Sequence, residues 1–284
     1  MTGIVLGAVA YDPKVVTIWS GFRSWLREHD LDLDFVLYSH YERQTEDLVA
    51  GRIDAAWQSP LAWLRSCRLA RAAGTDVRPL VMRDTDRDLT SVIVVRSNGP
   101  VATVADLKGE TVAVGAIDSP QATLLPLRHL RDAGLVPGAD FRVRRHDTGV
   151  GLHGDHIGGE REAARAVLAG EVAAACMSDA SHLTFGLEGA LPAGTTRVLA
   201  RTAPFDHCVL AAGPSLGATR GERLSALLES MSYADPDVRH LLDLEGLRQW
   251  LPGRDTGFGD LATAVDEAGF YDAEGAVTIA GYRP

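Results

Sequence analysis

The sequence has few cysteines and no long apolar run. Its three cysteines, at positions 67, 176 and 208, are odd in number and widely spaced, which favours free thiols in a reducing compartment over a disulfide framework. No stretch approaches the roughly 18 consecutive apolar residues that span a membrane, and Asp12 and Pro13 interrupt the apolar amino terminus where a secretory signal would continue. These absences predict a cytoplasmic protein without membrane insertion, unless an export segment has been removed.

A basic surface stripe is also missing. The net charge is −10, and the lysines and arginines are interspersed among acidic residues, which argues against nucleic-acid binding. The sequence contains no G-x-x-x-x-G-K-[ST], no H-E-x-x-H and no paired C-x-x-C. Nucleotide hydrolysis, which depends on the first of these motifs, therefore has no support.

Composition and periodicity predict a globular α/β protein. The chain has 284 residues, of which 46% are hydrophobic and 23% charged, so it can bury a sizeable core, and two lobes are favoured over one. Apolar runs typical of strands, "IVLGAVA", "LDFVLYS", "RIDAAWQSP" and "RPLVMR", alternate with segments whose apolar residues have helical spacing. This order predicts mainly parallel sheets flanked by helices.

The alternation begins again after the apolar run "LTSVIVVRSN" at 89–98. Three segments, "YERQTEDLVAGRIDAAWQSPLAWL", "VADLKGETVAVGAIDSPQATLLPLRHLRDAGL" and a helix ending in "AGEV" before a strand, resemble the phosphonate-binding (phosphate, phosphite and phosphonate) branch of the type II periplasmic solute-binding proteins. The resemblance covers roughly the whole chain. It implies two lobes joined by two crossing hinge segments, with residues 1–90 and 204–284 in one lobe, 91–203 in the other, and the ligand between them.

Helix N-termini predict where a ligand binds. In open α/β sheets, ligands bind outside the carboxyl ends of strands, where helix N-termini offer unpaired N–H groups to an anion. Four strand-to-helix junctions qualify, at 10–14, 39–43, 58–60 and 118–123. The resemblance implies hydroxyl and amide donors from "DSPQAT", although Ser119 and Pro120 also fit an ordinary helix start. The predicted ligand-binding residues are Tyr11, His40, Tyr41, Gln58, Ser59, Ser119, Gln121, Thr123, Glu160 and Asp206.

A glycine-rich loop contains residues that a protein binding only an oxyanion would not need. "GVGLHGDHIGGE" carries His153, Asp155 and His156 just ahead of a helix. The loop has three interpretations: a metal or catalytic site, a direct ligand contact without a metal, or a structural loop. Imidazole and carboxylate groups suit divalent transition metals, so His153 and His156 are candidate metal ligands. Glu160 would repel a phosphonate dianion.

The segment "PFDHCVL" is the second departure. It places Asp206, His207 and Cys208 in the chain that is expected to cross between the lobes. Strand alternation would point His207 away from its two neighbours, and a single cysteine in an apolar strand is more often part of the core.

Two functions follow from these patterns. The first is a cytoplasmic solute-binding protein that closes on a small polar or anionic ligand, with a transporter as partner only if an export signal was removed. The second is an enzyme on the same fold whose catalytic residues are His153, Asp155, His156, His207 and Cys208, with or without a metal. The sequence identifies neither the ligand nor a cofactor.

Overall fold

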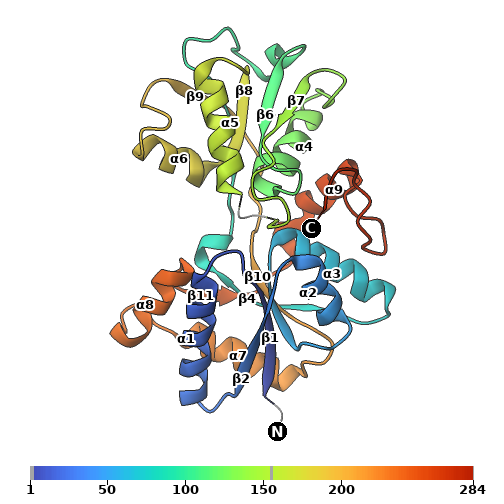
Figure 1. Cartoon of the computed structure of the whole chain (residues 1–284), viewed down its shortest axis with the longest axis vertical. Coiled ribbons are helices and arrows are strands. Elements are labelled where there is room, and N and C mark those ends of the chain that lie inside the picture. Colours follow the sequence, from blue (N-terminus) through green and yellow to red (C-terminus); the bar gives the residue numbers. More distant parts are fainter. Residues whose placement is uncertain (1–2, 154–155, 284) are drawn as a thin grey trace.

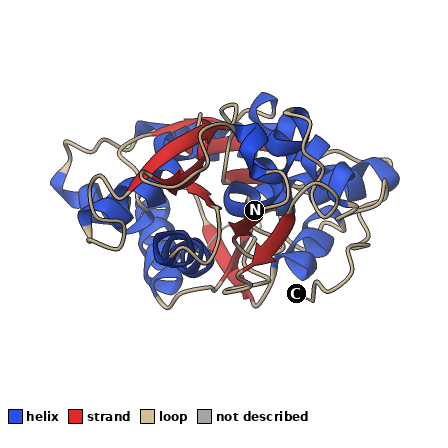
Figure 2. Cartoon of the chain, turned by 90° about the horizontal axis from the view of Figure 1, so that it is seen from above, coloured by secondary structure: helices blue, strands red, loops and turns tan. Residues whose placement is uncertain are grey.

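The computed structural model describes residues 3–153 and 156–283 and contains two β-sheets, one above the other in Figure 1. The first sheet has the strand order β11-β4-β10-β3-β1-β2, and the second has the order β7-β6-β8-β5-β9. Seen from above, the strands lie in the interior and the helices surround them (Figure 2). This arrangement confirms the predicted α/β class.

The first sheet combines amino-terminal and carboxy-terminal strands. They are β1 (Ile4–Val9), β2 (Leu33–Tyr38), β3 (Ala55–Gln58), β4 (Arg78–Arg83), β10 (Val209–Ala212) and β11 (Trp250–Pro252). β1 pairs in parallel with β2 and β3, whereas β10 is antiparallel to both β3 and β4. The carboxyl ends of β1, β3 and β4 and the amino end of β10 therefore lie along one edge.

The second sheet comes from the middle of the chain. Its strands are β5 (Ser91–Arg96), β6 (Thr111–Val114), β7 (Arg142–Arg145), β8 (Ala174–Ser178) and β9 (Thr196–Arg201). β6 pairs in parallel with β7 and β8, while β5 runs antiparallel to β8 and β9. All five residues of β8 are buried, as expected for a strand that is covered on both faces.

Nine α-helices are found in the described part of the chain. They are α1 (Lys14–Glu28), α2 (Tyr41–Val49), α3 (Pro60–Ala72), α4 (Leu125–Asp132), α5 (Ile157–Ala169), α6 (Asp179–Leu187), α7 (Ala218–Ser230), α8 (Pro236–Glu245) and α9 (Gly259–Ala268). α1 buries Val15, Ile18, Trp19, Phe22 and Leu26, a helical spacing that packs one face on the sheet. No helix among the described residues is both long enough and apolar enough to cross a bilayer.

The chain crosses between the sheets twice, at 84–90 and at 202–208. The two crossing segments pair with each other, because Leu89 and Phe205 exchange two backbone hydrogen bonds of 2.8 Å. Arg254 reinforces the second segment through two 2.6 Å contacts with the buried carboxylate of Asp206. The two crossing segments are thus tied to each other by backbone hydrogen bonds.

The carboxy-terminal segment packs against elements of both sheets. Phe258 and Val265 belong to one apolar cluster with Ile117 and Leu125, which flank the start of α4. Glu267 on α9 forms ion pairs with two arginines of α4, at 2.9 and 3.1 Å. In Figure 1, α9 accordingly lies at the level where the two sheets meet.

Candidate functional site

A cavity of about 200 Å³ lies where β1, β3 and β4 end. It is lined by Tyr11, Lys14, Tyr41, Trp57, Ser59, Arg83, Leu152, His207 and Cys208. Three of the four predicted strand-to-helix junctions contribute to it, because α1 begins at Lys14, α2 begins at Tyr41 and Ser59 caps α3. The positive ends of three helix dipoles are therefore gathered at this edge of the sheet.

Two cationic side chains extend over aromatic rings of the cavity. Lys14 Nζ is 5.9 Å from the centroid of the Tyr11 ring, and the Arg83 guanidinium carbon is 5.2 Å from the centroid of the Trp57 ring. Contacts of this kind hold a cation in place over an apolar surface. The cavity thereby combines positive charge with aromatic walls.

Arg83 is also the centre of a buried charge cluster. It donates to both oxygens of Asp86, at 2.5 and 2.9 Å, and to a carboxylate oxygen of Glu245 at 3.2 Å. Burial alone raises the pKa of Asp86, but the charge of Arg83 and a hydrogen bond from His207 outweigh burial and lower that pKa to about 2. Asp86 is therefore ionised at neutral pH.

Glu245 behaves differently in the same cluster. Its burial outweighs the charge of Arg83, and nearby Asp86 adds repulsion, so the pKa of Glu245 is raised to about 7. Glu245 thus titrates near neutrality, and its charge subtracts from that of Arg83 when it ionises.

His207 supplies a third positive charge to the cavity. Its Nδ1 lies 3.1 Å from Cys208 Sγ and 3.4 Å from Asp86 Oδ1, and its backbone N–H donates to the Asp86 carbonyl at 2.8 Å. Burial lowers the pKa of His207, but the charge of Cys208 and the hydrogen bond to Asp86 outweigh it and raise the pKa to about 10. His207 is therefore an imidazolium at neutral pH.

The ligand atoms of Asp86, His207 and Cys208 lie within 4.8 Å of one another, close enough to hold a metal ion. Arg83, however, pairs with both carboxylate oxygens of Asp86 and places a cation where the metal would bind. Among the described residues, the possible metal-binding set does not include His153 or His156. The metal site predicted from the spacing of those two histidines therefore has no support in the geometry.

His153 lies behind the cavity wall rather than in the cavity. Its ring is fully buried, with Nδ1 3.1 Å from Ser59 Oγ and Nε2 2.8 Å from Glu42 Oε1 and 2.6 Å from the Tyr282 hydroxyl. The ring also stacks on Tyr41 with centroids 5.0 Å apart. The loop that follows β7 is thereby joined to α2, α3 and the carboxy-terminal segment.

Glu42 is the buried acceptor at the centre of this junction. Burial raises the pKa of Glu42, but hydrogen bonds from His153 and Tyr282 and the charge of His153 outweigh it and lower the pKa to about 2. The Glu42 carboxylate consequently favours the position of the loop in which His153 is inserted.

His156 has a separate partner. Its Nε2 is 3.1 Å from Asp118 Oδ1, and the other oxygen of Asp118 accepts from the backbone N–H groups of Gly151 and His153. The two histidines thus engage different carboxylates. Asp155 lies outside the described residues.

The fourth predicted junction does not line the cavity. Ser119 caps the turn that begins at Pro120, by accepting from Ala122 N, and Gln121 donates to Glu160. Glu160 is buried and also accepts from Ser178 N. Ser119, Gln121, Thr123 and Glu160 therefore lie in the packed interior, beside the loop rather than at the cavity.

The remaining predicted ligand residues also have structural partners. His40 caps α2 and lies 3.3 Å from Glu42 Oε2. Gln58 is fully buried and donates to Ser66, and Asp206 is held by Arg254. Of the predicted set, the cavity wall contains Tyr11, Tyr41, Ser59, His207 and Cys208.

The predicted site residues did not include four residues that line the cavity, Lys14, Trp57, Arg83 and Leu152. Arg83 could have been identified from its position in the chain, because it is the last residue of β4, whose carboxyl end lies at the same edge of the first sheet as the cavity. Junctions that lead from a strand into an α-helix do not include the end of β4, which leads into the crossing segment 84–90.

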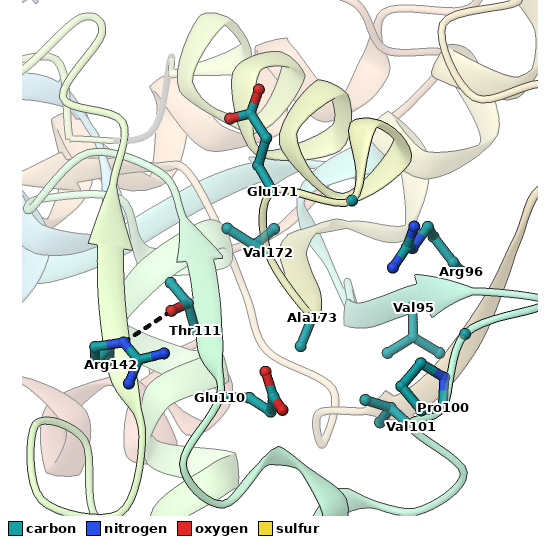
Figure 3. Close-up of a pocket in the computed structure, with 12 residues that line it drawn as sticks. Val95, Arg96, Pro100, Val101, Glu110, Thr111, Arg142, Glu171, Val172 and Ala173 are labelled. Carbon is teal, nitrogen blue, oxygen red and sulfur yellow. Dashed lines mark hydrogen bonds between the residues drawn. The ribbon is translucent and has the colours of Figure 1, made fainter.

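A second hollow, of about 190 Å³, lies at the far end of the second sheet (Figure 3). Arg96, Glu110, Arg142 and Glu171 surround it, and Arg142 donates to Thr111 at 3.1 Å. This hollow is at the amino ends of β6, β7 and β8, the edge opposite to the one where helix N-termini gather. The cavity beside Arg83 is therefore the stronger candidate.

Comparison with known proteins identifies the family of this chain. Residues 8–258 match the family described as ABC transporter, phosphonate, periplasmic substrate-binding protein. Similar solved structures include PhnD1 of Prochlorococcus marinus in complex with methylphosphonate, with 15% identity and a TM-score of 0.66 over 93% of this chain and 97% of that one. A Xanthomonas citri protein bound to ATP has 18% identity and a TM-score of 0.69 over 94% and 98% of the two chains. The aliphatic sulphonate-binding protein SsuA of Escherichia coli has 22% identity and a TM-score of 0.55 over 94% and 83%.

The family match corrects one prediction. The sequence analysis expected a cytoplasmic protein, whereas the matching family is periplasmic. The cytoplasmic assignment is therefore wrong. It relied on the amino-terminal sequence and on the cysteine count, and neither of these reports where a mature chain resides.

Proposed function

Because the chain belongs to the family of phosphonate-type periplasmic substrate-binding proteins of ABC transporters, we propose that its cavity binds a small oxyanion of the phosphonate type. The observation that carries the proposal is the convergence of Lys14, Arg83 and His207 on one cavity at three helix N-termini. Positive charge and oriented N–H groups stabilise an oxyanion. Tyr11, Trp57 and Leu152 offer an apolar surface to an organic substituent.

Closure of two lobes is the proposed output of binding. The lobes would be residues 1–90 with 204–284 and residues 91–203, which is consistent with the strands that make up each sheet. The ligand would contact helix N-termini of one lobe and the loop at Leu152 from the other. A closed state favoured by such contacts is what a membrane transporter would recognise.

Calorimetry against methylphosphonate, phosphate, methanesulfonate and acetate tests the proposal. We expect the phosphonate or another oxyanion of the panel to bind, and Lys14→Met to weaken that binding by roughly 10- to 100-fold, because a charge-assisted contact contributes about 1.5–3 kcal/mol. The chain has one other lysine, the exposed Lys108, and Lys108→Met is the matched control. Absence of binding across the panel, or equal losses in the two variants, would contradict the proposal.

Glu245 makes the affinity depend on pH. Because its pKa is raised to about 7, Glu245 is neutral below that pH and gains a negative charge beside Arg83 above it. We expect the affinity for methanesulfonate, whose own charge is constant, to fall roughly fivefold between pH 6 and pH 8. His207 does not confound this range, since its pKa is about 10.

The variant Glu245→Gln should flatten this pH dependence, whereas the exposed Glu222→Gln should retain it. The free energy of unfolding should also fall as the pH rises. Because the pKa of Glu245 is higher in the folded than in the unfolded protein, wild type loses stability relative to Glu245→Gln between about pH 4.5 and about pH 7. Parallel profiles for wild type and Glu245→Gln would show that Glu245 is not the titrating group.

A further inference from the structure

Residues 259–283 form a carboxy-terminal strap that consists of α9 and the segment after it. In Figure 1, α9 lies between α4, which follows β6 of the second sheet, and α3, which follows β3 of the first. Glu267 on α9 forms ion pairs with Arg128 and Arg131 of α4, at 3.1 and 2.9 Å. Apolar residues of α9 also belong to one cluster with the start of α4. The α9 end of the strap is therefore attached to a helix of the second sheet.

The segment after α9 is attached to α3, on the side of the first sheet. Arg65 Nε donates to the Gly275 carbonyl at 2.8 Å. Arg68 donates to the Tyr271 carbonyl at 3.0 Å. Gly275 has φ +88°, and a Cβ at this position would lie 3.1 Å from Cγ of Leu69, so the strap backbone packs too closely on α3 for a side chain. The strap thus contacts helices of both sheets.

Tyr282, near the end of the strap, is buried between elements of the two sheets. Its hydroxyl donates to Glu42 Oε1 of α2 at 2.7 Å and lies 2.6 Å from Nε2 of His153, in the loop after β7. The side chain is 6% exposed, and its ring centroid is 5.0 Å from that of Phe270. Burial raises the pKa of Tyr282, so the hydroxyl keeps the proton that it donates.

The loop after β7 connects this contact to the cavity wall. Leu152 lines the cavity and is followed by His153, whose ring is fully buried. Because the two residues are adjacent, withdrawing Leu152 from the cavity would also pull His153 away from Tyr282 and Glu42. Neither Tyr282 nor Glu42 lines the cavity. Their hydrogen bonds join protein groups directly and do not depend on a ligand.

We propose that the strap is a clamp that holds the two proposed lobes closed on each other without a ligand, and that a ligand enters the cavity only when the strap releases the loop at His153. Ligand entry rests on the proposed function, whereas the clamp rests only on contacts within the protein. A clamp of this kind lowers the association rate constant, because only the small open fraction of molecules admits the ligand.

Hydrogen exchange of the ligand-free protein, resolved to single amides by mass spectrometry, tests the clamp. The backbone N–H groups of Gly151 and His153 donate to the buried carboxylate of Asp118, so they exchange only when the loop opens. We expect Tyr282→Phe to speed exchange at these two amides roughly 10- to 100-fold, because it removes a hydrogen bond to a charged group and keeps the ring.

Tyr233→Phe is the matched control for this variant. It also removes a hydrogen bond from a tyrosine hydroxyl to a carboxylate, that of Asp243 at 2.6 Å, but this bond stays within residues 233–243. Exchange at the loop amides should therefore keep the wild-type rate. Equal rates in wild type and Tyr282→Phe would overturn the inference.

Glu267→Gln tests whether the strap acts as a unit. Glu267 is on α9, at the opposite end of the strap from Tyr282, and its substitution weakens the two ion pairs with α4. We expect exchange at the loop amides to increase by up to about fivefold. Glu188→Gln is the control, because it weakens an ion pair with Arg161 of α5 that does not involve the strap. An effect confined to Tyr282→Phe would indicate local packing and would also overturn the inference.

Stopped-flow mixing with methylphosphonate separates the clamp from the proposed function. The association rate constant in Tyr282→Phe should rise by the same factor as the exchange rate, because both are proportional to the open fraction. Faster exchange with an unchanged association rate constant would show that the strap does not control ligand entry. If exchange responds as expected but no oxyanion of the panel binds, the clamp stands and the proposed function is contradicted.

Discussion

Arg83→Met is expected to abolish oxyanion binding and to destabilise the protein. The substitution removes a cation from the cavity wall and leaves Asp86 and Glu245 buried without their common partner. Removing one member of a buried ion pair costs roughly 3–5 kcal/mol, because the remaining charge is uncompensated. We therefore expect a clear fall in the urea midpoint of unfolding and no measurable binding of methylphosphonate.

A second variant separates these two effects. Arg78 lies at the other end of β4, is exposed, and its side chain donates to the Leu216 carbonyl at 3.0 Å. Arg78→Met should leave both affinity and stability close to wild type. If Arg83→Met retained wild-type affinity in protein that is still folded by circular dichroism, Arg83 would not be part of the binding site.

His153→Asn is expected to release the loop that follows β7 and to weaken ligand binding. The His153 backbone has φ +53°, a conformation that asparagine tolerates better than most residues, so this variant removes the side-chain contacts without adding backbone strain. Loss of the contacts with Glu42 and Tyr282 leaves a buried carboxylate with fewer donors. We expect roughly 2–3 kcal/mol of destabilisation and an affinity lowered at least tenfold.

Small-angle X-ray scattering gives a second readout of this junction. In wild type, His153 joins the loop to α2, α3 and the carboxy-terminal segment, so its loss should increase the radius of gyration of the free protein. The exposed His240→Asn on α8 is the control. An unchanged radius of gyration and an unchanged affinity would show that His153 contributes only to local packing.

The stability of the same junction should also depend on pH. The pKa of Glu42 is lowered to about 2, below its ordinary value of 4.5. The ionised Glu42 therefore contributes to the free energy of unfolding above about pH 4.5, and this contribution is lost as the pH falls toward 2. The contribution should be smaller in His153→Asn, where the main donor to the carboxylate is gone.

Local patterns in the sequence were sufficient for the elements and for part of the site. Apolar residues at helical spacing predicted helices between the first strands, and α1 spans Lys14–Glu28 between β1 and β2. The junction rule identified Tyr11, Tyr41 and Ser59, because a strand that leads into a helix places the first helical residues at the carboxyl edge of the sheet. These features depend on neighbours in sequence, so they can be recognised without the fold.

Contacts between distant segments could not be recognised in this way. His153 meets Glu42 and Tyr282 across sequence separations of 111 and 129 residues, and no spacing within the loop encodes either partner. The predicted pairing of His153 with His156 relied on their closeness in the chain, whereas each ring is directed to a different carboxylate. Arg83 was missed because its significance depends on β10 and α8 lying beside β4.

The amino-acid sequence by itself determined the α/β class, the order of its elements and the helix N-termini that face the cavity, because hydrophobic period and capping act over a few residues. The tertiary structure alone decided which charges share the cavity and which are buried against one another. Pairing energies depend on distance and on exclusion of water, and both are set only when segments far apart in the chain pack together.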